Sequence, residues 1–198
     1  MAIVNVPMGP AIVEYGTGAD KIVFDITKGG IVFTANTSTK DITVDQYGDA
    51  PVKSIIKGRT AKVTVPFAVQ DLDRLAKAIP NATLITSGTG AKAKKKIEVT
   101  VSAGFDLSST AKPLVIKPTD PNATPNDWVT IPLAAAVTDP EYTYDDDKER
   151  IVKVEFTAYV DFDKGGLLYI LGTRRQNQKR ASKTKREGAR SPSFIEWR

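Results

Sequence analysis

Apolar and polar residues alternate with a period of two along most of this chain, and this pattern restricts it to a mainly β fold. The longest case lies between Val152 and Phe162, where every second residue is apolar. Because successive side chains of a strand point to opposite faces, one row meets a core and the other meets water. Segments 61–67 and 97–103 alternate in the same way. Shorter candidate strands are Ala11–Tyr15, Lys21–Thr27, Ile31–Thr37, Asp41–Asp45, Val52–Lys57, Ala82–Thr86, Pro113–Lys117, Trp128–Pro132 and Gly165–Leu171.

One segment breaks the alternation and predicts a single helix. Its apolar residues recur at three- and four-residue spacing, at Val69, Leu72, Leu75, Ala76 and Ile79. This spacing lines one face of a helix, and acidic residues near its start are favourable against the helix dipole. The Pro-Asn pair that follows ends it. We therefore expect a mainly β domain, a β-sandwich or small barrel with one flanking α-helix.

The chain contains neither cysteine nor histidine. Without cysteine there are no disulfides, thiolate metal sites or thiol nucleophiles, which fits assembly in a reducing cytoplasm. Without histidine, the usual general base near neutral pH and the commonest ligand of transition metals are missing. Carboxylate pairs, lysine chemistry and oxygen-ligated cations remain. We expect a protein that is not an enzyme and uses no cofactor and no metal.

The hydropathy of the chain argues against attachment to a membrane. It contains no run of about 18 apolar residues, the length that a spanning helix requires. The segment Met1–Pro10 lacks the basic region and the apolar run of a signal peptide. We therefore expect no membrane anchor.

The positive charge of the chain is concentrated at its C-terminal end. The net charge is +5, whereas residues 173–198 contain nine Lys and Arg against two Glu, a charge of +7. We therefore expect a β domain of charge about −2 over 1–172 and a basic C-terminal tail over 173–198. Two interpretations of the tail stay open, binding of a polyanion or protein partner and a solvated terminus. The candidate contact residues are Arg174, Arg175, Lys179, Arg180, Lys185 and Arg186.

Six acidic residues crowd the segment Thr138–Arg150, which we expect to be a long loop. A helix-loop-helix calcium site needs a glycine at the sixth position of its loop, and this segment has none. No spacing in it identifies the two carboxylates of a glycosidase. A solvated hairpin tip is the favoured interpretation.

A glycine-rich turn at Gly88-Thr89-Gly90 precedes Lys92 and a further run of lysines. It lacks the four-residue spacer and the terminal Lys-Ser/Thr of a phosphate-binding loop. We therefore expect a hairpin turn that leads into the strand from Lys96. A third long loop, Phe105–Asp127, contains four prolines and should be extended and stiff in places.

The segment from Gly29 to Ile79 carries an ordered series of turns and strands. Gly29-Gly30 is followed by Asp45-Gln46-Tyr47-Gly48-Asp49-Ala50-Pro51-Val52 and then by Ile55-Ile56-Lys57-Gly58. As local structure this predicts a β-meander, with a turn at each glycine, that ends in the helix.

This series resembles the major tail tube proteins of long-tailed bacteriophages. In that family a Gly-Pro, here Gly9-Pro10, precedes the first strand, and a double glycine leads to an Asp-Gln-x-Gly-x-x-Pro-Val turn. An Ile-x-x-Gly step, an alternating strand and a single helix follow. The resemblance covers about Gly9 to Phe162. Ala50 replaces a more usual threonine, and the tail after Gly172 has no counterpart in the pattern.

The resemblance implies a β-sandwich flanked by a helix, six copies of which form a ring. Rings stack into the hollow tail tube of the virion, through which DNA passes without specific binding. Neighbouring copies pair edge strands, and assembly takes place in the host bacterial cytoplasm. Further partners would be tape-measure, terminator and baseplate or sheath proteins. The expected ring or stacking contacts are Asp45, Gln46, Tyr47, Gly48, Pro51, Lys94, Lys95, Lys96, Asp145, Asp146 and Asp147.

Two other classes of function are compatible with the composition. The first is a small nucleic-acid-binding β protein that acts through its basic tail, although an aromatic stacking motif is missing. The second is a carbohydrate-binding sandwich, which needs surface tryptophans, and the chain has only Trp128 and Trp197. A salt-dependent gel shift discriminates the first from a tube protein.

Overall fold

The computed structural model of the chain describes residues 9–69, 71–88, 90, 93–101, 103–142, 144–147 and 149–172. Within them the fold is mainly β, with one α-helix and two antiparallel sheets. The larger sheet consists of β1 (Ala11–Tyr15), β2 (Ile22–Phe24), β3 (Val32–Thr43), β4 (Pro51–Phe67), β7 (Lys112–Pro118), β8 (Val129–Ala136), β9 (Val152–Ala158) and β10 (Ile170–Leu171). The smaller sheet pairs β5 (Ala82–Ser87) with β6 (Lys94–Val99). The basic tail, with its six candidate contact residues, lies outside the described residues.

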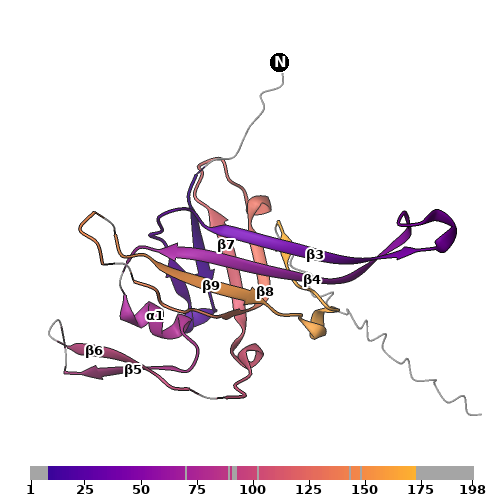
Figure 1. Cartoon of the computed structure of the whole chain (residues 1–198). Helices are drawn as coiled ribbons and strands as arrows, with labels where there is room; N and C mark the ends of the chain where they lie inside the picture. Colours follow the sequence, from indigo (N-terminus) through magenta and orange to yellow (C-terminus); the bar gives the residue numbers. More distant parts are fainter. Residues whose placement is uncertain are drawn as a thin grey trace, which may run out of the picture.

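The larger sheet is strongly bent, and its two ends enclose the core. Its strand order is β2-β1-β7-β8-β9-β4-β3, with β10 on β8. Strand β8 pairs with β7 over its first part and with β9 through Ala134–Ala136, and a register shift interrupts the β7 pairing. Such irregularities bend a strand. As a result β1 and β7 run across β4 and β9 (Figure 1).

Aromatic rings join the two ends of the bent sheet. The ring of Phe24 on β2 meets the ring of Phe67 on β4 edge to face, with centroids 5.1 Å apart. The Tyr15 ring on β1 lies 4.9 Å from the Phe156 ring on β9. All four side chains are buried, and contacts of this kind stabilise a core beyond the area that they bury.

The sheet is not a closed barrel, so the small-barrel alternative is wrong for the single chain. Across the gap between β2 and β4, the described residues form one isolated bridge, between Thr27 and Phe67. Two backbone hydrogen bonds flank it, from Ala68 N to Ile26 O and from Lys28 N to Pro66 O, both 3.1 Å. The barrel does not close, because β2 ends at Phe24 and the remainder of this edge of β4 pairs with β3.

The predicted helix is confirmed as α1 (Leu72–Ala78), which buries Leu75 and Ala78 against the sheet. The Asp71 side chain caps its start by accepting a hydrogen bond from Asp73 N at 2.9 Å. No helix in the described part of the chain is long and apolar enough to cross a membrane.

The β3–β4 hairpin is much longer than the sequence predicts. The candidate strands on each side of Ser38–Lys40 are one strand, β3, and those on each side of Gly58 are one strand, β4. The expected glycine turn at Gly58 is therefore wrong. Gly58 pairs with Ser38 beside a register shift at which Lys57 has no partner, so the bulge absorbs one residue while the strand continues.

The bounds of two other strands differ from the alternation pattern. Strand β6 begins at Lys94 and ends at Val99, because its lysines pair with β5. Strand β9 ends at Ala158, and beyond it a single backbone hydrogen bond to β8 follows, from Tyr159 N to Leu133 O at 2.8 Å. Within the expected loop 105–127, the predicted strand Pro113–Lys117 is confirmed as β7, and two short 3-10 turns flank it, η4 (Leu107–Thr110) and η5 (Pro125–Asp127).

Candidate assembly interface

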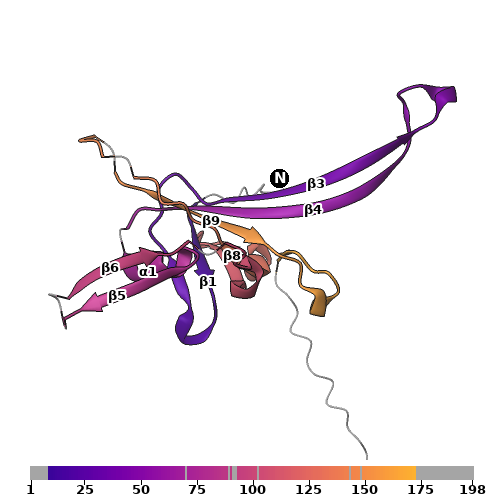
Figure 2. The ribbon, with the colours of Figure 1, turned by 60° about the horizontal axis from the view of Figure 1, so that its bottom comes forward.

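A long two-stranded arm projects from the domain. Every residue from 34 to 60 is exposed, and we call this part of the β3–β4 hairpin the arm. At its base the buried residues Ala61, Val63 and Val65 anchor β4 in the core. Beyond them the two strands pair only with each other, and the ribbon extends away from the domain (Figures 1 and 2).

The arm exposes several large apolar side chains to solvent. The large exposed apolar residues on it are Ile42, Val44, Tyr47, Val52, Ile55 and Ile56. Tyr47, at the tip, is 72% exposed. An isolated two-stranded ribbon is marginally stable in water, and clustered exposed apolar side chains mark interaction surfaces. The arm is therefore a candidate interaction surface.

Five of the predicted contact residues come together at the tip of the arm. Asp45, Gln46 and Tyr47 form the 3-10 turn η2, which a hydrogen bond from Tyr47 N to Val44 O closes at 3.0 Å. Gly48 follows with φ 60° and ψ −134°, a conformation that residues with a Cβ avoid. Pro51 then begins β4. The sequence interpretation of a tight turn at this place is confirmed.

Strand β3 also presents a free edge. Among the described residues β3 pairs only with β4, so the backbone groups on its other side have no strand partner. The edge runs from Val32 to Thr43 without a proline and with a single lysine, Lys40. Natural proteins usually protect edges of this length with charges, prolines or covering segments. This edge is open to pairing with another chain.

The lysines Lys94, Lys95 and Lys96 lie on β6, away from the arm tip (Figure 1). Two of them have partners within the chain. Lys95 Nζ pairs with the Asp73 carboxylate of α1, and Lys96 Nζ lies 2.5 Å from Glu98 Oε1. The Lys95 pair ties the small sheet to the helix.

The acidic residues Asp145, Asp146 and Asp147 lie in the connection between β8 and β9, also remote from the arm tip (Figure 1). Asp147 N donates to Asp145 Oδ1 at 3.3 Å, which orders a local turn. Nearby, Glu149 pairs with Lys28 at 2.5 Å, and this contact lowers the pKa of Glu149. The three sets of predicted contact residues, at the arm tip, on β6 and in the connection between β8 and β9, therefore lie on separate parts of the surface.

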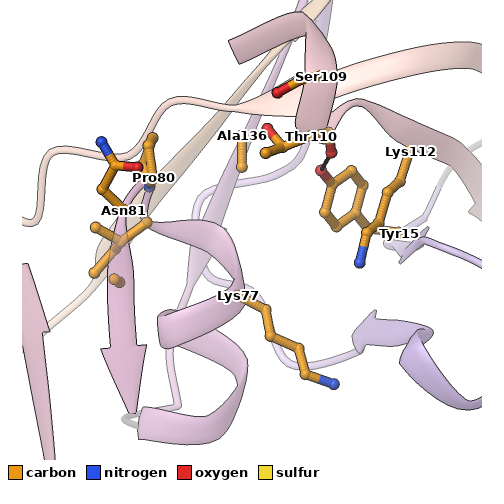
Figure 3. Close-up of a pocket in the computed structure, with 10 residues that line it drawn as sticks. Tyr15, Lys77, Pro80, Asn81, Ser109, Thr110, Lys112 and Ala136 are labelled. Carbon is orange, nitrogen blue, oxygen red and sulfur yellow. Dashed lines mark hydrogen bonds between the residues drawn. The ribbon is translucent and has the colours of Figure 1, made fainter. Parts of the chain in front are cut away.

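A pocket that the sequence did not predict lies where α1 ends beside the sheet. Its volume is about 400 Å³. It is lined by Tyr15, Lys77, Ile79, Pro80, Asn81, Ala82, Ser109, Thr110, Lys112 and Ala136 (Figure 3). Burial raises the pKa of the Tyr15 hydroxyl, which donates to Thr110 O at 3.4 Å. The lining comes from α1, β1, β5, η4, β7 and β8, so no local motif could reveal it.

The described residues contain no group of three or more acidic side chains arranged to hold a metal ion. A single buried side-chain polar atom in this part of the chain, Thr138 Oγ1, has no hydrogen-bond partner there. The chain matches no model of a known protein family, and no curated protein matches it significantly.

Proposed function

We propose that this protein is a non-catalytic structural subunit that assembles with copies of itself into rings, which stack as the tail tube of a long-tailed bacteriophage. The arm is the observation that carries the proposal. It exposes both faces of a ribbon and six large apolar side chains, and its strands pair only with each other. Identical neighbours supply the missing contacts.

The open sheet supports ring formation. Its ends are the short strand β2 and the long free edge of β3. Pairing such edges between identical subunits, related by a rotation that closes, gives a ring without unpaired strands. On this proposal the sheets of six copies together close the barrel, which no single chain closes. The bent, sandwich-like sheet of each copy forms one segment of the barrel wall.

The outer face of the sheet suits the wall of a conduit. The strands that bury Val63 and Val154 turn alternate side chains outward, among them Lys62, Thr64 and Glu155. Hydroxyls and charges of both signs let a polyanion slide past, whereas a uniformly basic wall would hold duplex DNA. DNA would therefore pass without specific binding.

By the same proposal, the protein is a virion component made in the host bacterial cytoplasm. Its further partners are proteins that set tube length, end the tube or join it to the baseplate or a sheath. The arm tip, the lysines of β6 and the acidic connection before β9 are its candidate ring or stacking contacts.

Negative-stain electron microscopy and sedimentation velocity over a range of concentrations test the proposal. We expect six-fold rings or hollow tubes from the full chain. A matched variant that replaces residues 39–56 with a short glycine-containing turn should remain folded and monomeric. A full chain that stays monomeric at high concentration, and that shifts duplex DNA in a salt-dependent way, would instead support the nucleic-acid-binding alternative.

A further inference from the structure

The arm and the pocket beside α1 lie on opposite sides of the molecule. In both views of the ribbon, the tip of the arm points away from α1 and β5, which border the pocket (Figures 1 and 2). A contact between two unlike surfaces at opposite ends repeats from copy to copy, and it produces an open stack when the relation between copies does not close into a ring. The arm cannot reach the pocket of its own chain, so any tip in that pocket belongs to another copy.

The tip combines one aromatic ring with negative charge. Tyr47 is 72% exposed, and Asp45 and Asp49 lie within two residues of it. Residues 44–52 contain no lysine or arginine. Tyrosine is favoured as an interface anchor because its ring buries a large area while its hydroxyl keeps a hydrogen-bonding group.

The pocket has the complementary chemistry. Ile79, Pro80, Ala82 and Ala136 give it an apolar lining. Its charged residues are both lysines, Lys77 of α1 and Lys112 of β7 (Figure 3). Lys112 Nζ also lies 3.9 Å from Asp20 Oδ2. The volume of about 400 Å³ lies in the range of pockets that enclose one ligand-sized group.

We infer that the pocket beside α1 receives the arm tip of a second copy, with the Tyr47 ring on the apolar lining and the tip carboxylates beside Lys77 and Lys112. This inference rests on the proposed function and names the stacking contact within it. The Tyr47 hydroxyl reaches the polar groups of the lining, which Asn81 and Ser109 provide. The two ends are complementary in charge, so the contact also fixes the direction of the stack.

Charge exchange tests the contact in the full chain. Lys77→Glu with Lys112→Glu should raise the concentration needed for tube formation about tenfold or more, and Asp45→Lys with Asp49→Lys should do the same. A chain that carries all four changes should regain tubes. The control pair Lys94→Glu with Lys96→Glu changes the same charge on β6 and should have a smaller effect.

The outcomes separate the two proposals. If the unmodified chain forms no rings or tubes, the proposed function fails and the inference fails with it. If the unmodified chain forms tubes and the Lys77→Glu, Lys112→Glu chain forms them equally well, only the inference is overturned. Circular dichroism of each variant identifies loss of folding, in which case Lys77→Gln with Lys112→Gln replaces the reversal.

Cysteine cross-linking gives a second, direct measurement, because the chain has no cysteine of its own. A Tyr47→Cys chain mixed with a Ser109→Cys chain should form a disulfide between the two different chains under oxidising conditions. The control replaces Tyr47→Cys by Thr37→Cys, near the base of the arm, and should cross-link at least tenfold less. Equal cross-linking from both positions contradicts the inference.

Discussion

At the scale of single residues, Arg74 is the side chain that attaches α1 to the sheet. Its guanidinium lies 2.8 Å from both Asp25 Oδ1 and Val23 O, and 3.2 Å from Asp71 Oδ2. It also stands over the Phe67 ring, 5.6 Å from the centroid. One cation therefore satisfies a backbone carbonyl of β2, two carboxylates and an aromatic face.

Arg74→Met should lower the free energy of unfolding by about 1–2 kcal/mol. Methionine keeps the apolar stem but leaves the Val23 carbonyl without its donor, and the exposure of the ion pair limits the loss. Urea denaturation, monitored by tryptophan fluorescence, measures this loss of unfolding free energy. The control Lys77→Met lies on the exposed side of the same helix and should change stability by less than about 0.5 kcal/mol. Equal losses would show that Arg74 has no special role.

The same contact makes stability depend on pH. The hydrogen bond from Arg74 lowers the pKa of Asp25, and one from Lys117 does the same for Glu14. A carboxyl whose folded pKa is depressed stabilises the fold above its unfolded pKa, near 4, and this contribution disappears as pH falls through the folded value. Below pH about 4, the stability difference between the native chain and Arg74→Met should therefore shrink. A difference that is constant from pH 6 to pH 3 would contradict this coupling.

At the scale of elements, the arm is the part of the fold with the least support. Its strands pair only with each other, whereas the base of β4 pairs with both β3 and β9. Local stability follows such contacts, so the two halves of β4 should open with very different free energies.

Hydrogen exchange measures this difference. In the monomer, amides of the arm, for example Lys53 and Ile55, should exchange at least tenfold faster than those of Val63 and Val65. Assembly should protect the arm and leave the core amides unchanged. Equal protection of arm and core in the monomer would show that the arm is stable without a partner and would remove the main support for the assembly proposal.

The sequence patterns located the helix and most strands, but they did not show which strand segments join into one strand. Alternation identified most strands, and three- and four-residue spacing identified α1, because one buried face determines each of these elements. The arm buries neither face, so its strands show little alternation, and Gly58 suggested a turn. The cross-strand pairs on either side of Gly58, Thr37 with Arg59 and Thr39 with Ile56, show that the ribbon continues.

The candidate sites differ in the same way, because one is built from neighbours in sequence and the other from residues that only folding brings together. The tip residues Asp45–Pro51 are neighbours in sequence, so their turn could be predicted from composition. The pocket could not, because Lys77, Ser109 and Lys112 approach one another only when α1, η4 and β7 meet at the edge of the sheet. Likewise the partners of Lys95 and Lys96 depend on how β6 pairs and packs.

At the scale of the whole molecule, the sheet, core and arm are all built from residues that precede the basic tail. Residues 9–172 supply every strand described above, the free edge of β3 and both surfaces of the inferred stacking contact. Residues 1–172 carry a charge of about −2, against +5 for the full chain. The cationic segment thus reverses the sign of a mildly acidic domain.

A chain that ends at Gly172 should therefore still form rings and tubes of unchanged bore. Its retention of duplex DNA at low salt should fall about tenfold or more, because the cations that release counterions from a polyanion are concentrated in the removed segment. Electron microscopy measures the bore, and binding at two salt concentrations measures the retention. A full-length variant with the tail Lys and Arg changed to Gln separates charge from length and should behave like the truncated chain. Failure of the truncated chain to form rings, while the Gln variant assembles, would show that the tail is itself a structural part of the tube.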